Sequence, residues 1–519
     1  MSTQAAGQNA PVDTAGARAA GRGGLAIAVA KVSFILVGFV QQLVFPRILD
    51  EAGYGAVSRM LAAVSVVNNV VVAMSLQGVS RVTVQTPEQE REQAIRNVLT
   101  IHAVIAVVFS TLFALLAGTI ADLLKAPRAA APLRVAAAVV LCYGVYAPLV
   151  GALNGKKRFL DQAALDIFYG LSRTVAMTTM AWVFARFLGG DGALGAAVGF
   201  VAAATVIIPV AIWRNGLGRS GAGGPSAAEY LKFLLPIFAA QGGLNLLLQL
   251  DLLLLSRVSG TYAAALGLGE KEADKLLAPY RASQLFGFLP YQLLMSVQFV
   301  LFPMLAKASS DGDSAAVKRL TRIGMRLAFV LTGLIAGSIA ALAPHLVRFA
   351  FPESIALQAA PFARVYSLGL GGLAILGVAS AALASLRHER WSMALTWLAA
   401  ALVFVSISAF RPDGSFGPAL LKSTAYATAG AMGLSGLIGA VALKRAAGAL
   451  VSPLTVLRVG LAVVVVVALG SFTPYLGKLL TPVVAVLAAL VYLLVLVVSG
   501  ELGTSDLDLV RAVLARRRK

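Results

Sequence analysis

Apolar runs about twenty residues long recur from one end of this 519-residue chain to the other. Each run is long enough to cross the ~30 Å hydrocarbon core of a bilayer as a helix. Hydrophobic residues make up 59% of the chain and charged residues only 13%, about half of what a soluble domain carries. Because lipid offers no hydrogen bonds, spanning segments must satisfy their backbone groups internally. The sequence therefore predicts an all-α polytopic membrane protein in contact with membrane lipid.

The spacing of the runs predicts about fourteen transmembrane helices, arranged as two six-helix lobes and an appended helix pair. The linker 214–230, rich in Gly, Ser and Pro, separates the lobes 25–213 and 231–442, and the pair occupies 454–499. Two halves with equal helix numbers indicate an internal repeat, which is common in transporters. The expected spans are 25–46, 56–80, 98–121, 132–153, 160–185, 192–213, 231–256, 279–306, 323–345, 357–385, 391–410, 415–442, 454–473 and 479–499.

The basic residues predict how the chain lies in the membrane. The larger share of its 43 Lys and Arg residues falls in every second loop, so we expect those loops on the cytoplasmic side. Both termini are then cytoplasmic: a disordered tail at 1–24 and a basic tail at 500–519. We expect a multi-pass protein of the bacterial inner membrane. Despite the net charge of +20, no basic-aromatic module suggests a nucleic-acid partner.

Motifs for catalysis and cofactors are missing from the sequence. There is no P-loop, zinc-binding or triad pattern, the single Cys142 lies in an apolar run, and the three histidines are scattered. The outer loops are also short for a membrane glycosyltransferase or polymerase. We predict no catalytic residues, no metal and no cofactor, and thus a transporter rather than an enzyme, driven by an ion gradient or the membrane potential.

Ionisable residues inside the apolar spans are candidates for function, because each costs about 2.5–3.5 kcal/mol to insert. They are Lys31 in the first span, Asp166 and Arg173 in the fifth, and Asp251 in the seventh. Three of them have a plainer alternative, whereas Arg173 lies deeper in its span and is expected to line a cavity. Lys31 could snorkel to lipid phosphates, Asp166 could pair with the basic cluster at 156–158, and Asp251 could pair with Arg257. Asp166 and Asp251 are the candidates for ion coupling.

Further basic residues predict a cationic lumen. Arg59 and Arg281 occupy matching places near the starts of the second and eighth helices, and Lys422 lies in the twelfth. Guanidinium groups bind phosphates through paired hydrogen bonds, so such a lumen suits an anionic, phosphate-bearing substrate. The alternative is that these residues only anchor helix ends at the interface. The predicted substrate-binding set is Lys31, Arg59, Arg173, Arg281, Gln284 and Lys422.

Three short motifs resemble a known family in order and position. The stretch 45–55 reads FPRILDEAGYG, Leu235-Pro236 precedes the run that begins at Asp251, and 302–305 reads FPML. They resemble the polysaccharide branch of the multidrug/oligosaccharidyl-lipid/polysaccharide exporter superfamily, and the similarity in helix number and linker position extends over most of the chain. One departure is Asp50, where that family usually has Gly, so the turn there could differ in shape.

The resemblance implies two lobes around a central cavity that opens alternately to each side. It also implies export of undecaprenyl-pyrophosphate-linked oligosaccharide for O-antigen, capsule or exopolysaccharide assembly, with a polysaccharide polymerase as a candidate partner. Three alternatives stay open: a lipid II flippase, an ion-coupled drug antiporter of the same fold, and a membrane glycosyltransferase or polymerase.

Overall fold

The computed structural model describes residues 14–410 and 416–503, which form fifteen α-helices and one short 3-10 helix. The helices of the first half are α1 (Thr14–Ile48), α2 (Glu51–Gln85), α3 (Arg91–Leu123), α4 (Ala130–Gly155), α5 (Phe159–Phe187) and α6 (Gly192–Asn215), with η1 (Pro127–Ala129) before α4. Those of the second half are α7 (Ala227–Ala265), α8 (Glu270–Gly287), α9 (Leu289–Ser310), α10 (Ser314–Ala350), α11 (Glu353–Ser385), α12 (Glu389–Ala409) and α13 (Pro418–Ala447). The last two are α14 (Pro453–Phe472) and α15 (Thr481–Val498).

The predicted class, an all-helical polytopic membrane protein, is confirmed. Eleven helices of the described ranges are long and apolar enough to cross a membrane. One predicted segment differs, because the eighth span (279–306) is divided between α8 and α9 at Phe288. Pro290 is the second residue of α9 and has no N–H to donate to the preceding turn, which explains the break. The total of fourteen spans stays a prediction.

The first helix also begins earlier than expected. Residues 14–24, predicted as part of a disordered tail, are helical, because α1 begins at Thr14 rather than near residue 25. Four alanines between positions 15 and 20 account for this, since alanine has the highest helix propensity. The rest of the predicted N-terminal tail, 1–13, and residues 504–519 of the basic tail lie outside the described residues.

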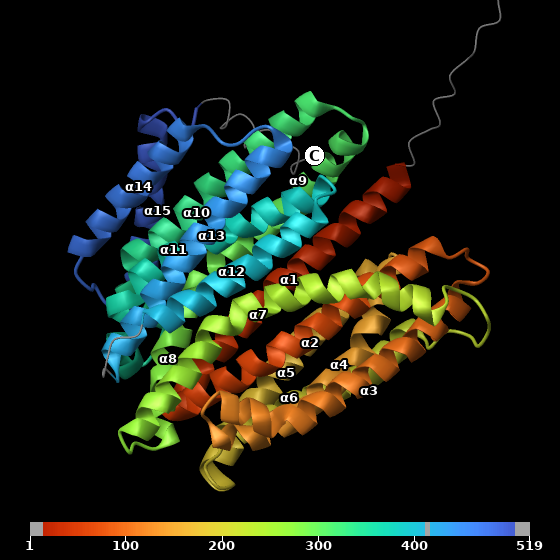
Figure 1. Cartoon of the computed structure of the whole chain (residues 1–519), viewed down its shortest axis with the longest axis horizontal. Coiled ribbons are helices and arrows are strands. Elements are labelled where there is room, and N and C mark those ends of the chain that lie inside the picture. The colour runs from red at the N-terminus through yellow and green to blue at the C-terminus, as the bar shows by residue number, and fades with distance from the viewer. Residues whose placement is uncertain (1–13, 411–415, 504–519) are drawn as a thin grey trace, which may run out of the picture.

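Two groups of helices make up the body of the molecule (Figure 1), α1–α6 on one side and α8–α13 on the other. Small residues let the helices within each group approach closely. Between α11 and α13, for example, a Cβ added to Gly436 would lie 2.6 Å from the carbonyl oxygen of Gly372. Such contacts require glycine and fix the separation of these two helices.

The long helix α7 joins the two groups, and in Figure 1 it crosses from the first to the second. Its first turns pack on the first group, where the Tyr230 hydroxyl lies 2.7 Å from Nε2 of His102. The linker before it is also held there, because the Asn97 side-chain amide donates to the carbonyl oxygens of Gly221 and Gly223 at 3.1 and 2.7 Å. Farther along, α7 packs against α8 and α12.

The appended helices α14 and α15 lie at one edge of the molecule beside α10 (Figure 1). Buried Glu501, just after α15, accepts hydrogen bonds from Arg326 of α10 at 2.8 Å and from Thr455 of α14 at 3.0 Å, and pairs with Arg458 at 3.4 Å. One carboxylate therefore ties both appended helices to α10.

Candidate functional site

The two helix groups meet at one end of the bundle, where α2 packs against α8. We call this the outer end, because the predicted topology places the α1–α2 and α7–α8 connections in the periplasm. The approach of the two backbones is very close, since a Cβ on Gly55 would overlap the carbonyl oxygen of Asp274. Asp50 begins α2 as its N-cap and accepts from the Gly53 N–H at 2.7 Å, with φ at −70°. No glycine is needed at that turn, which explains the departure at position 50.

Arg59 lies within this contact and is only 3% exposed. Its guanidinium pairs with Asp274 and, at 2.8 Å, with Glu270, both on α8. Glu270 also accepts the backbone N–H of Arg128, at 3.0 Å, from the segment between α3 and α4. Arg59 was predicted to line a cationic lumen together with Arg281, but in this conformation two carboxylates neutralise it. We name Arg59, Glu270 and Asp274 the outer ion cluster.

Asp274 of the outer ion cluster has a raised pKa. It precedes the predicted eighth span, and burial raises its pKa from 3.8 to about 7, although Arg59 acts in the opposite direction. Glu270 nearby adds to the rise. The carboxyl group therefore changes its charge near neutral pH while the outer end is closed.

Further contacts between the two groups lie at the same end. Arg257 donates to the carbonyl oxygen of Leu123 at 2.8 Å, and Arg47 donates to that of Ala350 at 2.8 Å. One interpretation of the sequence paired Arg257 with Asp251, but in the structure Arg257 bonds to Leu123 instead. Together with the outer ion cluster, these bonds close the outer end.

One face of α2 packs against α8 at the outer end and is exposed toward the inner end. Gly55, Arg59, Ala62, Asn69 and Gln77 follow spacings of three, four, seven and eight residues, which keep side chains on one side of a helix. The first three are buried, whereas Asn69 and Gln77 are exposed. The two groups therefore diverge along α2, and polar side chains appear on the inner part of its face.

Arg281, also on α8, is linked to the predicted ion-coupling residue Asp251. It is half-buried and donates to Gln284 Oε1 at 3.0 Å, while Gln284 Nε2 donates to Asp251 Oδ1 at 2.9 Å. Gln284 was predicted to contact substrate, but it is fully buried and both ends of its amide are bonded. In this conformation it connects two candidates instead of lining a cavity.

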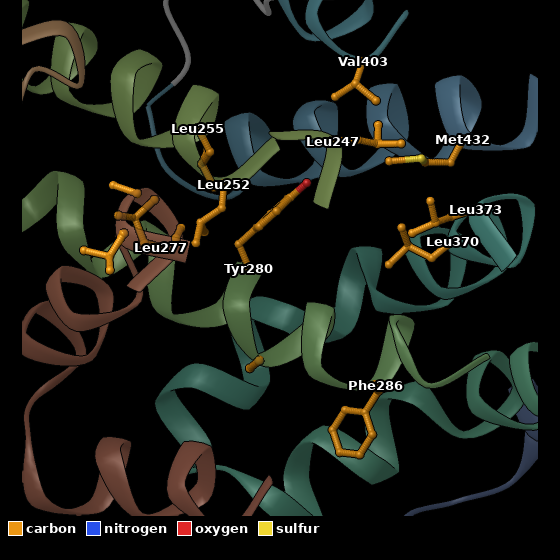
Figure 2. Packing of buried hydrophobic residues seen from close by; sticks show 14 of the residues in the cluster. Leu247, Leu252, Leu255, Leu277, Tyr280, Phe286, Leu370, Leu373, Val403 and Met432 are labelled. Atoms are coloured by element: carbon orange, nitrogen blue, oxygen red, sulfur yellow. The ribbon is translucent and has the colours of Figure 1, made fainter. Parts of the chain in front are cut away.

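Asp251 lies in the interior of the second group, 1% exposed. Its Oδ2 accepts from the hydroxyls of Tyr280 at 2.9 Å and Tyr366 at 2.6 Å, and no described Lys or Arg pairs with it. Figure 2 shows Tyr280 extending from α8 into the apolar cluster that contains Leu247 and Leu252 of α7. A carboxyl group with polar neighbours but no cation suits a site that takes up a proton or a small cation.

The first group contains a second polar cluster. Arg173 donates to Gln41 of α1 at 3.4 Å, and its guanidinium lies 4.8 Å from the ring centroid of Phe34. Arg173 and Asp166 both interact electrostatically with Tyr143, so the structure brings these two candidates of α5 to a common neighbour.

One predicted substrate-binding residue lies apart from both polar clusters. Lys422 is exposed, and its Nζ lies 5.6 Å above the ring of Tyr426 on its own helix. Lys31 belongs to α1, but its side chain lies outside the described part of the structure.

Glu270 and Asp274 are not among the residues predicted from the sequence. The signal was present, because both belong to the charged run EKEADK directly before the eighth span. The composition of that run gives no sign that its carboxylates turn inward to meet α2 rather than outward to water.

The fold of this chain matches that of several solved transporter structures. A structure described as "Lipid II flippase MurJ, inward closed conformation" matches with a TM-score of 0.67 at 15% identity, over 90% of this chain and 97% of that one. An inward-facing multidrug resistance MATE family transporter of the MOP superfamily matches with a TM-score of 0.61 at 13% identity, over 81% and 98%. The Vibrio cholerae MATE transporter VcmN in its bent form matches with 0.54 at 14% identity, over 83% and 98%. These likenesses concern the fold alone.

The sequence supplies the family. Residues 44–355 match the profile of the polysaccharide biosynthesis protein family, so the chain belongs to that family, as its short motifs suggested. No curated protein matches the chain in sequence. The chain is thus a polytopic membrane protein of the polysaccharide biosynthesis family, with the fold of the solved structures above.

Proposed function

We propose that this protein translocates undecaprenyl-pyrophosphate-linked oligosaccharide across the bacterial inner membrane, for O-antigen, capsule or exopolysaccharide assembly. The observation that carries the proposal is the match of residues 44–355 to the polysaccharide biosynthesis family on a transporter fold. The termini lie in the cytoplasm, and a polysaccharide polymerase is the expected partner for the product.

The geometry supports alternating access as the mechanism. The outer end is closed by the outer ion cluster, while the same face of α2 is exposed toward the inner end. The substrate's diphosphate enters from the inner side and is held by Arg281 and Arg173, and its lipid tail stays in the bilayer. Opening the outer end then requires the outer ion cluster to separate.

Asp251 couples this movement to an ion. Its chain of hydrogen bonds through Gln284 to Arg281 connects the ion site with the phosphate site. When a substrate phosphate draws the Arg281 guanidinium away from Gln284, the amide is free to turn and the environment of Asp251 changes. Asp166 is the corresponding candidate in the first group.

The test is translocation by the purified protein in liposomes that contain undecaprenyl-pyrophosphate-linked oligosaccharide with a fluorescent sugar. We expect the labelled sugar to become accessible to an added impermeant quencher on the opposite side only when the protein is present. In cells, loss of the gene should cause the lipid-linked intermediate to accumulate on the cytoplasmic side. Absence of translocation in liposomes together with normal polysaccharide export in the deletion strain contradicts the proposal.

One alternative has a specific observation in its favour. The fold likeness to the lipid II flippase structure, with a TM-score of 0.67, makes lipid II a second candidate substrate. The same liposomes loaded with lipid II distinguish the two. Faster translocation of lipid II than of the oligosaccharide lipid favours this alternative.

A further inference from the structure

A cavity of about 420 Å³ lies on α2 at its inner end, away from all the residues predicted to bind substrate. Most of the exposed lining surface is apolar, but the lining also contains one guanidinium group, three amides and one hydroxyl, which can bond to sugars or phosphates. The lining residues are Leu76, Gln77, Ser80, Arg81, Val84, Gln85 and Asn154.

This cavity opens on the face of α2 that closes against α8 at the outer end. Ser80 and Val84 continue the spacing of Arg59 and Gln77 along the helix, so all four lie on that face. At ~1.5 Å per residue, Arg81 lies about 33 Å along α2 from Arg59, roughly one hydrocarbon thickness. On the predicted topology, this spacing puts the cavity at the level of the inner lipid headgroups, beside α7, whose Phe233 contacts Arg81.

The guanidinium of Arg81 is held in place without being neutralised. It lies 4.1 Å from the ring centroid of Phe233 on α7, and its Nε donates to Gln85 at 3.1 Å. No described carboxylate pairs with it, in contrast to Arg59 and to Arg158, which is bonded to Asp161. Its two terminal amino groups can therefore bind the oxygens of a phosphate in parallel. Arginines that only snorkel at helix ends need no such fixed position.

We propose that this cavity is an entry site for a polyprenyl-pyrophosphate-linked glycan. The site binds the pyrophosphate and the first sugar before the glycan lipid moves between the two helix groups. The inference rests on the proposed function, and it adds a second binding site to it. Arg81 binds the phosphates, which lie at headgroup level in a membrane-embedded substrate. Gln77 binds the hydroxyls of the adjoining sugar. The Ser80 hydroxyl donates to Asn154 Oδ1 at 3.0 Å, which leaves its oxygen able to accept a hydrogen bond from the same sugar.

The test is binding to the full chain in phosphatidylcholine nanodiscs, with undecaprenyl pyrophosphate and its N-acetylglucosamine-linked form as probes. Arg81→Ala should weaken binding of both probes about tenfold to a hundredfold, as expected for loss of a charge-assisted bond. Gln77→Ala should weaken only the sugar-bearing probe, by about fivefold. Arg214→Ala is the control for loss of a basic residue, because Arg214 stacks on Trp213 in the same half, pairs with Asp161 at 3.2 Å and does not line the cavity. It should bind both probes as the wild type does.

A competition experiment and a translocation assay distinguish the remaining outcomes. Equal competition by phosphatidylglycerol would mean that the cavity binds ordinary phospholipid headgroups, which overturns the proposal. In the translocation assay, Arg81→Ala should raise the substrate concentration for half-maximal rate about tenfold and leave the maximal rate unchanged. If the wild type translocates substrate and Arg81→Ala behaves identically, the entry site alone is refuted. If the wild type translocates neither probe, the result refutes the proposed function and not the entry site alone.

Discussion

Closure of the outer end should depend on pH through Asp274. With the outer end closed, burial raises the pKa of this carboxyl group from 3.8 to about 7. Opening exposes it to water, where its pKa returns toward its ordinary value. Because the pKa is higher in the closed state, proton binding stabilises closure. That stabilisation is complete below the open-state pKa and is lost as the pH rises through about 7.

The size of the effect follows from one titrating group. Between pH ~6 and pH ~8 the closed state releases most of one proton, whereas the open state is already ionised. The closed state is then destabilised by about 1.3 kcal/mol, a roughly tenfold change in the ratio of closed to open molecules. We expect molecules with an open outer end to be about ten times more frequent relative to closed ones at the higher pH.

Distance measurements between spin labels check this prediction. Labels on Arg186→Cys and Ser354→Cys report on the outer ends of the two groups, in a chain whose only other cysteine, Cys142, has been replaced. Asp274→Asn should abolish the pH dependence, because the amide does not titrate. Glu272→Gln is the control on the same helix. Its carboxylate pairs with Lys275 at the surface and not with Arg59, so this variant should respond to pH as the wild type does.

Two results would refute the reasoning. The first is a wild-type distance distribution that is identical at both pH values. The second is a pH response that persists in Asp274→Asn, since another group would then control the closure.

Four further predictions concern the transport residues, the appended pair and the topology. Arg281→Ala should lose nearly all polysaccharide export per unit of membrane-inserted protein and Arg281→Lys should keep part of it, because an ammonium binds a diphosphate only as a point charge; full export by the Ala variant removes Arg281 from the site. Asp251→Asn should still bind substrate but lose the acceleration of transport by an ion gradient, and an unchanged response in liposomes argues against coupling there. Glu501→Ala should weaken attachment of α14 and α15 by about 2 kcal/mol, because Arg326 and Arg458 lose a shared partner, seen as faster hydrogen exchange in both helices; unchanged exchange contradicts this. A cysteine at position 221 should react only with membrane-permeant reagents, and labelling from the periplasm in intact cells would reverse the predicted topology.

Helix formation and its limits were largely predictable from the sequence. In lipid a helix satisfies its own backbone, so a run of about twenty apolar residues specifies a helical segment without reference to its neighbours. Where the predicted helix limits differ from the observed ones, the cause is local, and its strength was hard to judge from the sequence. Pro290 divides the eighth span within an otherwise continuous apolar run, and the alanines before residue 25 extend α1.

The candidate site was only partly predictable. Charge inside an apolar span singled out Asp251 and Arg173 as candidates, because a charge in lipid is costly. Arg281 was proposed from its place near the start of the eighth helix. Their partners could not be found in this way. Gln284 resembled a substrate ligand because its amide can bond to sugars, and only the packing of α7 on α8 shows that it bonds to Asp251 instead.

The sequence by itself thus determined the class of protein, the helical segments and the family, because these depend on local composition and short motifs. The tertiary structure alone decided what Arg59 does. Its partners Glu270 and Asp274 are more than 200 positions away, and helix periodicity shows which side chains share a face but not which face of another helix they meet. The same guanidinium charge can bind a phosphate in a lumen, or it can pair with carboxylates and close the outer end. The choice depends on how the two helix groups pack against each other.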